Sequence, residues 1–410
     1  MGLSRLLGGA SWGGRSLKGS AAACLLLLAA SSQAGEWTGE IAIEGRVFPQ
    51  EALEPGLQRA NVSASAEPEF YHEWGDGKQT FEFEGFARYD QHDSRRTHVD
   101  LRQLLWSYDS DWWEVRAGVG RVFWGVTESN HLVDVINQTD FVENLDGEDK
   151  LGQPMINFAL IQSWGTVDFF VLPGFRERTF FGPEGRPGLP IPIDLDNPFY
   201  ESERGRGHVD WAVRWSHSVG LFDFGASHFK GTSRDPRFLL RPAAGGESIL
   251  TPFYELIDQT GADVQLTQGA WLWKLELIHR RSDRDSFTAV TGGFEYTFSN
   301  IRDKGLDVGV LVEYSRDPRG VEMLTVFDDD IFSGVRLAFN DVQSTEILAG
   351  AAVDRNTGAM FVNVEGSRRF GSSFTLDIQM RAFVNASPEN VVVWALRKDS
   401  YLEARWAWHF

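Results

Sequence analysis

The sequence has a single cysteine, Cys24, among 410 residues, and it lacks long hydrophobic runs. Residues 25–410 therefore form no disulfide bond and offer no thiolate for catalysis or metal binding. The longest wholly apolar run is Ala21–Ala30, whereas a helix that spans a bilayer needs about 20 such residues. The sequence thus excludes a helical membrane protein.

Basic side chains are also scarce. The 39 Lys and Arg residues are outnumbered by 58 Asp and Glu residues, which gives a formal charge of −19. A chain this acidic repels nucleic-acid phosphates, so we expect no nucleic-acid partner. Disorder is excluded as well, because 42% of the residues are hydrophobic and 13% are aromatic.

Residues 1–34 have the parts of an export signal. A segment with three Lys or Arg residues precedes the apolar run Ala21–Ala30, and small residues precede a cleavage site after Ala34. We therefore expect residues 1–34 to be a signal peptide and residues 35–410 to be the exported protein. Residues 1–34 contain three basic and no acidic side chains. Without them the formal charge changes from −19 to −22 for residues 35–410.

The C-terminal residues are apolar at every second position: Leu402, Ala404, Trp406, Trp408 and Phe410. Successive side chains of a strand point to opposite faces, so this pattern predicts a strand with one apolar face. An ending of this kind resembles the C-terminal strand of Gram-negative outer-membrane β-barrels. In that class the barrel-assembly machinery reads the ending. The resemblance therefore implies that Trp406, Trp408 and Phe410 form a membrane-insertion signal.

The same alternation recurs in residues 35–410, in segments of about 9–11 residues that match the length of a tilted bilayer-spanning strand. Eighteen candidate strands start near Trp37, Gln58, Lys78, Thr97, Trp113, Pro154, Thr166, His208, Leu221, Thr251, Ala270, Ser286, Asp307, Asp330, Ser344, Ala359, Ser373 and Tyr401. We expect an all-β fold, a single transmembrane antiparallel up-and-down β-barrel with 18 strands. Sixteen strands are the alternative, because residues 153–173 and 251–267 alternate less regularly.

Connections between the candidate strands alternate between tight turns and longer loops, as in bacterial barrels with both termini in the periplasm. We expect residues 125–153 and 174–207 to be long external loops. In the general porins the third external loop folds into the lumen and narrows it, and residues 125–153 resemble that loop by position. Apolar residues at helical spacing predict a short helix within Thr127–Gln138.

A barrel in a membrane exposes apolar side chains to lipid, because a charge near the midplane costs about 2–4 kcal/mol. The polar face of each strand therefore points inward, and 16–18 strands enclose a lumen wide enough for water. The candidate pore-lining or constriction residues are Arg88, Arg102, Arg116, Asp134, Glu143, Asp146, Arg176, Arg178 and Arg214.

Two roles are open for the arginines among these candidate residues. Arg176 and Arg178 either form salt bridges at the external rim or face the acids of the 125–153 loop and contact a solute in a transverse field. Arg88, Arg102 and Arg116 occupy similar positions in consecutive strands. They either pair with Glu82, Glu84 and Glu114 or recognise an anion.

Motifs for enzymatic chemistry are missing. The nine histidines have no metal-ligand spacing, and the sequence has neither a GxxxxGK[ST] nor a GxSxG motif. We therefore expect no metal, no cofactor and no enzymatic activity.

In strand count and layout the chain resembles the eighteen-stranded substrate-selective porins and the alginate-export-type barrels. We expect an outer-membrane channel for the diffusion of small hydrophilic solutes, with outer-membrane lipids and lipopolysaccharide as neighbours. The alternatives are a closed structural or adhesive barrel, the membrane component of an export complex, and a barrel-embedded lipid hydrolase that uses Ser216–His217 or Ser227–His228. The sequence leaves the solute and the oligomeric state open.

Overall fold

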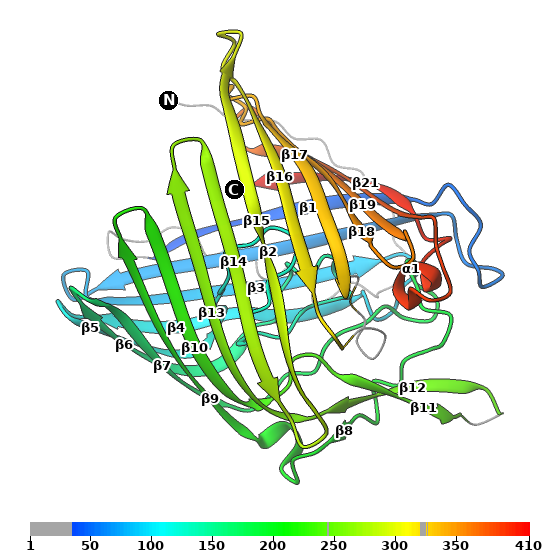
Figure 1. Ribbon diagram of the computed structural model, residues 1–410, viewed down its shortest axis with the longest axis horizontal. Coiled ribbons are helices and arrows are strands. Elements are labelled where there is room, and N and C mark those ends of the chain that lie inside the picture. The colour runs from blue at the N-terminus through cyan, green and yellow to red at the C-terminus, as the bar shows by residue number, and fades with distance from the viewer. Residues whose placement is uncertain (1–34, 244–245, 320–324, 326) are drawn as a thin grey trace, which may run out of the picture. The chain divides into compact units, whose positions relative to one another are not determined.

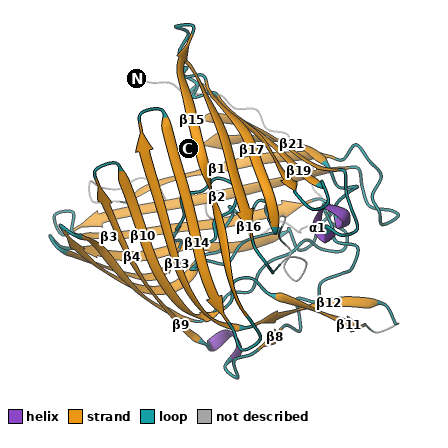
Figure 2. Cartoon of the chain, viewed as in Figure 1, coloured by secondary structure: helices purple, strands orange, loops and turns teal. Residues whose placement is uncertain are grey.

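The structure is a computed structural model that describes residues 35–243, 246–319, 325 and 327–410 (Figure 1). The described residues are almost entirely strands and loops, as Figure 2 shows. The expected signal peptide, residues 1–34, lies outside the described residues.

Eighteen strands form one sheet, and each pairs antiparallel with the strands before and after it in the series. They are β1 (Glu36–Val47), β2 (Ala60–Trp74), β3 (Gln79–Asp90), β4 (His98–Asp109), β5 (Trp113–Gly120), β6 (Gln153–Gln162), β7 (Gly165–Pro173), β9 (Val209–Val219), β10 (Phe222–Thr232), β13 (Leu256–Gln268), β14 (Trp271–Arg281), β15 (Ser286–Ile301), β16 (Leu306–Arg316), β17 (Asp329–Ala338), β18 (Glu346–Asp354), β19 (Met360–Phe370), β20 (Phe374–Val384) and β21 (Tyr401–His409). The first strand also pairs with the last, from Glu40↔His409 to Val47↔Leu402. This closure confirms the expected all-β barrel with 18 strands.

Short turns connect the strands at one end of the barrel, and most of the longer connections lie at the other end. The long-loop end carries a small sheet of β8 (Phe199–Tyr200), β11 (Arg237–Pro242) and β12 (Ser248–Tyr254), the 3-10 turn η1 (Gly205–Gly207) and the helix α1 (Val391–Ala395). Among the described residues, no helix is long and apolar enough to cross a membrane.

One expected strand boundary is wrong. The tenth barrel strand begins at Leu256 rather than near Thr251, because Ser248–Tyr254 pairs with β11 and β8 outside the barrel. Pro252 lies within this segment and cannot donate a backbone hydrogen bond, which suits a short edge hairpin better than a barrel strand.

Side chains alternate between the lumen and the outer wall, and the outer wall is apolar. On β1, Ile41 and Ile43 are 45% and 61% exposed, whereas the inward-facing Ala42 and Glu44 are 2% and 4% exposed. The C-terminal aromatic residues Trp406 and Trp408 are also exposed on the outer wall. An apolar exterior around a closed sheet is the surface that a lipid bilayer requires.

Replacing Ile43 by lysine should destabilise the folded barrel by about 2–4 kcal/mol, because this side chain lies in the middle of a lipid-facing strand. Leu53→Lys is the matched control, since Leu53 lies in the β1–β2 loop, where a surface change costs only about 0.5 kcal/mol. Denaturant unfolding in lipid vesicles measures both. Equal stability of the two variants would contradict the lipid-facing assignment.

Candidate functional site

The connection between β5 and β6, residues 121–152, is called the inner loop here because it binds inward-facing side chains of the barrel. Glu276 of β14 is fully buried, and its Oε1 accepts hydrogen bonds from the amides of Val126 and Thr127, at 2.7 and 3.0 Å. The Thr127 hydroxyl donates to the same oxygen at 2.7 Å, and the Val133 amide donates to Oε2 at 3.1 Å. One wall carboxylate therefore satisfies four donors of the inner loop.

A second wall carboxylate, Glu313 of β16, binds the adjacent residues. Its Oε1 accepts from the Glu128 amide at 2.8 Å, and its Oε2 accepts from the Ser129 amide and hydroxyl at 2.8 and 2.6 Å. The expected helix within Thr127–Gln138 is wrong, since these residues form turns and irregular backbone. A helix would direct the Val133 amide to the carbonyl of Ser129, but that amide donates to Glu276 instead.

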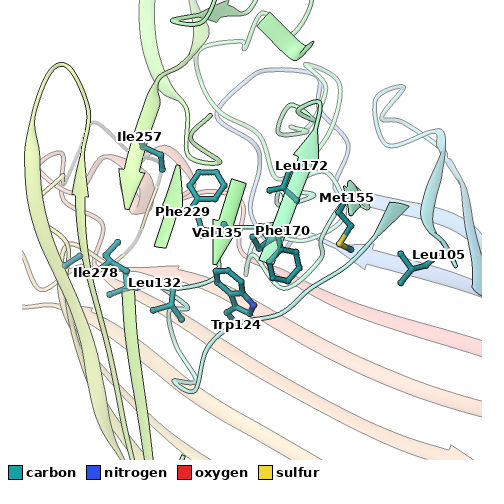
Figure 3. Close-up of a cluster of buried hydrophobic side chains, with 14 residues drawn as sticks. Leu105, Trp124, Leu132, Val135, Met155, Phe170, Leu172, Phe229, Ile257 and Ile278 are labelled. Carbon is teal, nitrogen blue, oxygen red and sulfur yellow. The ribbon is translucent and has the colours of Figure 1, made fainter. Parts of the chain in front are cut away.

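Apolar side chains pack the inner loop against one wall, where Trp124, Leu132 and Val135 lie beside residues of β7, β10 and β14 (Figure 3). The buried cluster consists of Leu105, Trp124, Leu132, Val133, Val135, Ile136, Met155, Phe170, Leu172, Ala212, Phe229, Ile257, Ile278 and Ala289. Several inward positions of these strands are therefore apolar where the inner loop covers them, while Glu276 of β14 supplies the hydrogen bonds there. Each fully buried large side chain contributes about 1.5–3 kcal/mol, so the inner loop is held by packing as well as by hydrogen bonds.

The tip of the inner loop, residues 139–150, reaches the opposite side of the ring of strands. The bridge Thr139↔Lys150 closes the tip at its base. Glu143 pairs with Arg88 of β3 at 2.7 Å, and Asp146 pairs with Arg381 of β20 at 2.5 Å. The structure thus brings together two of the predicted acids and one of the predicted arginines.

Arg176 and Arg178 lie in the next long connection, between β7 and β9, and make other contacts. Arg176 pairs with Asp100 of β4 at 2.6 Å, and Arg178 pairs with Asp235 at 2.8 Å. Among the described residues, no ion pair joins either arginine to the acids of the tip. The geometry matches the salt-bridge interpretation of these two residues.

The other predicted residues also have partners of opposite charge: Arg102 with Asp140 at 2.7 Å, Asp134 with Lys150 at 3.1 Å, Arg214 with Asp263 at 2.7 Å, and Arg116 with Glu114. Arg88, Arg102 and Arg116 therefore belong to separate ion pairs. Of the expected partners Glu82, Glu84 and Glu114, only Glu114 pairs with one of these arginines, Arg116. Arg88 pairs with Glu44 and Glu143 instead.

Two cavities adjoin the tip of the inner loop. The outer chamber has a volume of about 210 Å³, and its polar lining includes Asp235, which lies 2.8 to 3.1 Å from guanidinium nitrogens of Arg178, Arg280 and Arg319. Its apolar lining includes Phe141 and five further phenylalanines. Asp235 and Arg319 lie in connections that sequence analysis left without a role, because nothing in the local pattern indicates their neighbours.

The inner chamber has a volume of about 520 Å³ and lies against the other face of the tip. Its carboxylates are Glu40, Glu44, Glu67, Glu128, Glu143, Asp149, Glu346, Glu365, Asp377 and Glu403. Its four basic residues are Arg46, Arg88, Arg336 and Arg405. Acidic side chains thus outnumber basic ones ten to four in this chamber.

The carboxylates that surround the inner loop change the pKa values of its ionisable groups. Protein atoms surround the exposed carboxylate of Asp149 inside the barrel, and this desolvation, together with the like charges of Asp146 and Glu143, raises the pKa of Asp149 to about 7. Burial opposes protonation of His131, but the carboxylates of Glu148 and Glu276 outweigh it and raise the pKa of His131 to about 10. Desolvation also raises the pKa of Asp146 to about 6, although Arg381 opposes it. Asp146 and Asp149 are therefore two groups of the tip whose charge changes near neutral pH.

In each residue pair suggested for a lipid hydrolase, Ser216–His217 and Ser227–His228, the serine and the histidine are adjacent on one strand and point to opposite faces of the wall. Ser227 is buried on the inward face of β10, whereas its neighbour His228 lies on the outward face. Among the described residues, no group of three or more His, Cys, Asp and Glu side chains is placed to hold a metal ion.

No protein-family model and no curated protein matches this chain. Among solved structures, a mutant of the Rh. blastica porin is similar, with 12% identity, a TM-score of 0.44, and coverage of 92% of this chain and 100% of that chain. The high-pH structure of Pseudomonas putida OprB is also similar, with 11% identity, a TM-score of 0.45, and coverage of 92% and 94%. Neither similarity identifies a solute for this chain.

Replacing Glu276 by glutamine should free the inner loop from β14, because the amide NH₂ cannot accept the hydrogen bonds that one carboxylate oxygen now accepts. Each hydrogen bond to a charged group is worth about 1.5–3 kcal/mol. Hydrogen exchange of the Val126, Thr127 and Val133 amides should therefore become much faster while the barrel stays folded. Glu114→Gln is the matched control, since Glu114 pairs with Arg116 and not with the inner loop. Unchanged exchange at those three amides would contradict the role of Glu276.

Proposed function

We propose that this chain is a channel through which small hydrophilic solutes diffuse across the outer membrane of a Gram-negative cell. In this proposal the export signal directs the chain out of the cytoplasm, and Trp406, Trp408 and Phe410 present it to the barrel-assembly machinery. We propose that the inner loop narrows the lumen and that the predicted residues Arg88, Glu143 and Asp146 form the constriction.

The two chambers on either side of the inner-loop tip are the observation that carries this proposal. Both cavities lie inside a closed sheet and both adjoin the tip, residues 139–150, so they supply parts of a path for a solute. The excess of carboxylates in the inner chamber raises the local concentration of cations. We therefore propose a preference for cationic over anionic solutes.

The channel should give stepwise currents in planar bilayers. Replacing residues 144–148 by Gly-Gly should increase the unitary conductance, because it removes the part of the tip between the two chambers and leaves the Thr139↔Lys150 bridge intact. Shortening the β11–β12 connection by the same number of residues is a control that leaves the tip untouched. Absence of current from both the native barrel and the shortened-tip variant would exclude a channel.

Cation selectivity should increase with pH. The pKa of Asp149 is raised to about 7, so its side chain is mostly neutral at about pH 6 and mostly charged at about pH 8. The reversal potential in a salt gradient should therefore shift toward the cation limit over this interval. Asp149→Asn should remove the larger part of the shift and leave the part that comes from Asp146, whose pKa is raised to about 6, whereas Asp76→Asn in a short turn should leave the whole shift intact. A shift of equal size in Asp149→Asn would contradict the assignment.

A closed structural or adhesive barrel, or the membrane component of an export complex, is the second candidate. The observation that favours it is the number of bonds that hold the inner loop across the lumen, from Glu276 and Glu313 on one side to Arg88 and Arg381 on the other. A folded native barrel without conductance, which co-purifies with a periplasmic protein, would favour this second function.

A further inference from the structure

Eight polar side chains interrupt the apolar outer wall on four adjacent strands, β10, β13, β14 and β15. The strand register arranges them in two rows: His228↔Thr260↔His279↔Thr288, and Lys230↔Asp258↔Arg281↔Ser286. All eight lie near the end of the barrel that carries the long connections, which is the external end in bacterial barrels. This group is called the outer polar array below.

The array has sharp borders on two sides, toward β9 and toward the middle of the wall, whereas on the β16 side Arg316, which pairs with Asp329, continues the polar surface. On the neighbouring strand β9, the residues that continue the two rows are Val213 and Trp211. One position further from the external end, the four strands present Ala226, Ala262, Leu277 and Val290. Polar residues at a surface otherwise built for lipid tails require a polar partner in the membrane interface.

The array is basic, in contrast to the chain as a whole. Lys230 and Arg281 are permanent cations, and Asp258 is the single carboxylate. Lys230 is 61% exposed and lies 3.9 Å from Asp258, so its ammonium group remains open to a further anion. The imidazole of His228 lies 3.6 Å from the same carboxylate. Two cations and two imidazoles around one carboxylate form a surface that attracts phosphate.

A groove continues from the array along the lipid-facing wall. It has a volume of about 550 Å³ and is lined by Phe222, Val264, Leu266, Leu275, Val290 and Tyr314. Gly292 lies at its centre, paired with Leu275 on one side and Tyr314 on the other. The missing side chain leaves the wall hollow at that point. Val290 joins the groove to the array, because it lies two residues from Thr288 on the same strand.

The geometry points to a binding site for a phosphorylated lipid of the external leaflet. We propose that the lipid's phosphate group lies on Lys230 and Arg281, and that one acyl chain lies in the groove beside Gly292. A basic surface directly above an apolar groove matches the two ends of such a molecule. The contact between Ser286 and His279, 3.4 Å apart, also belongs to this headgroup surface. The other imidazole nitrogen of His279, Nδ1, lies 3.0 Å from the hydroxyl of Thr288. Its hydrogen-bond partner is therefore a hydroxyl group and not a carboxylate.

Native mass spectrometry of the purified full-length barrel with added lipid A tests the proposal. The native protein should retain lipid A and bind it more tightly than lipid A from which both phosphates have been removed. The double variant Lys230→Gln/Arg281→Gln should bind lipid A about 25-fold more weakly, because each cation near an anionic lipid is worth about fivefold. Its affinity for the dephosphorylated lipid should not change.

Two further variants separate the contributions. Gly292→Leu should weaken binding of both lipids, because it fills the groove. A Cβ at this position meets the flexible end of Leu275 at 2.9 Å and the carbonyl oxygen of Lys274 at 3.0 Å, so the strand pair must shift slightly, and heat-modifiable migration on a gel checks that this variant folds. Lys78→Gln/Lys304→Gln changes the net charge by the same amount at the short-turn end and should bind both lipids as the native protein does. Conductance measured on the same preparations reports on the channel independently of lipid binding.

Three outcomes would overturn the proposal. The first is equal lipid A affinity of the native protein and the Lys230→Gln/Arg281→Gln variant. The second is equal affinity of the native protein for lipid A with and without phosphates. The third is a lipid-free oligomer that this double variant dissociates, since the array would then be a contact between copies of the chain.

Discussion

Pairing of β1 with β21 is the interaction on which the rest of the structure depends. In a bilayer an unpaired amide or carbonyl group costs several kcal/mol, so a sheet can cross it only when no strand edge remains. The register from Glu40↔His409 to Val47↔Leu402 removes both edges. Closure also creates the interior in which Glu276, Glu313 and the inner loop find one another.

The strands were predictable because strand pattern and burial are both local. Seventeen of the eighteen expected starts lie close to the observed ones, since lipid on one face and a polar lumen on the other enforce alternation. The partners of the inner loop were not predictable. The contact of Glu276 with Val126 joins β14 to the connection between β5 and β6, which lies five to six strands away around the barrel, and it leaves no mark on either local sequence. The helix expected within Thr127–Gln138 failed for the same reason.

The inner loop and the outer polar array are two results of one departure from the pattern. On β10 and β14, the external ends place Phe229 and Ile278 inward, where the inner loop covers them. With a period of two residues, an apolar inward position leaves its neighbours, His228 and His279, on the outer wall. In a barrel strand, apolar residues can move from the outward to the inward face toward one end of the strand. Such a change indicates that a loop covers the lumen at that end and that the outer wall there is polar.

The hydrogen bonds of Glu276 and Glu313 also constrain the order in which the molecule assembles. Both carboxylates lie 143 to 185 residues after the amides that they bind, and contacts of such long sequence separation form late. During synthesis and insertion, the inner loop therefore cannot form these hydrogen bonds until β14 and β16 have been added to the barrel. A barrel whose assembly stopped before β14 and β16 were added would contain an unfilled interior. Formation of the hydrogen bonds of the inner loop would therefore show that the C-terminal half of the barrel is complete.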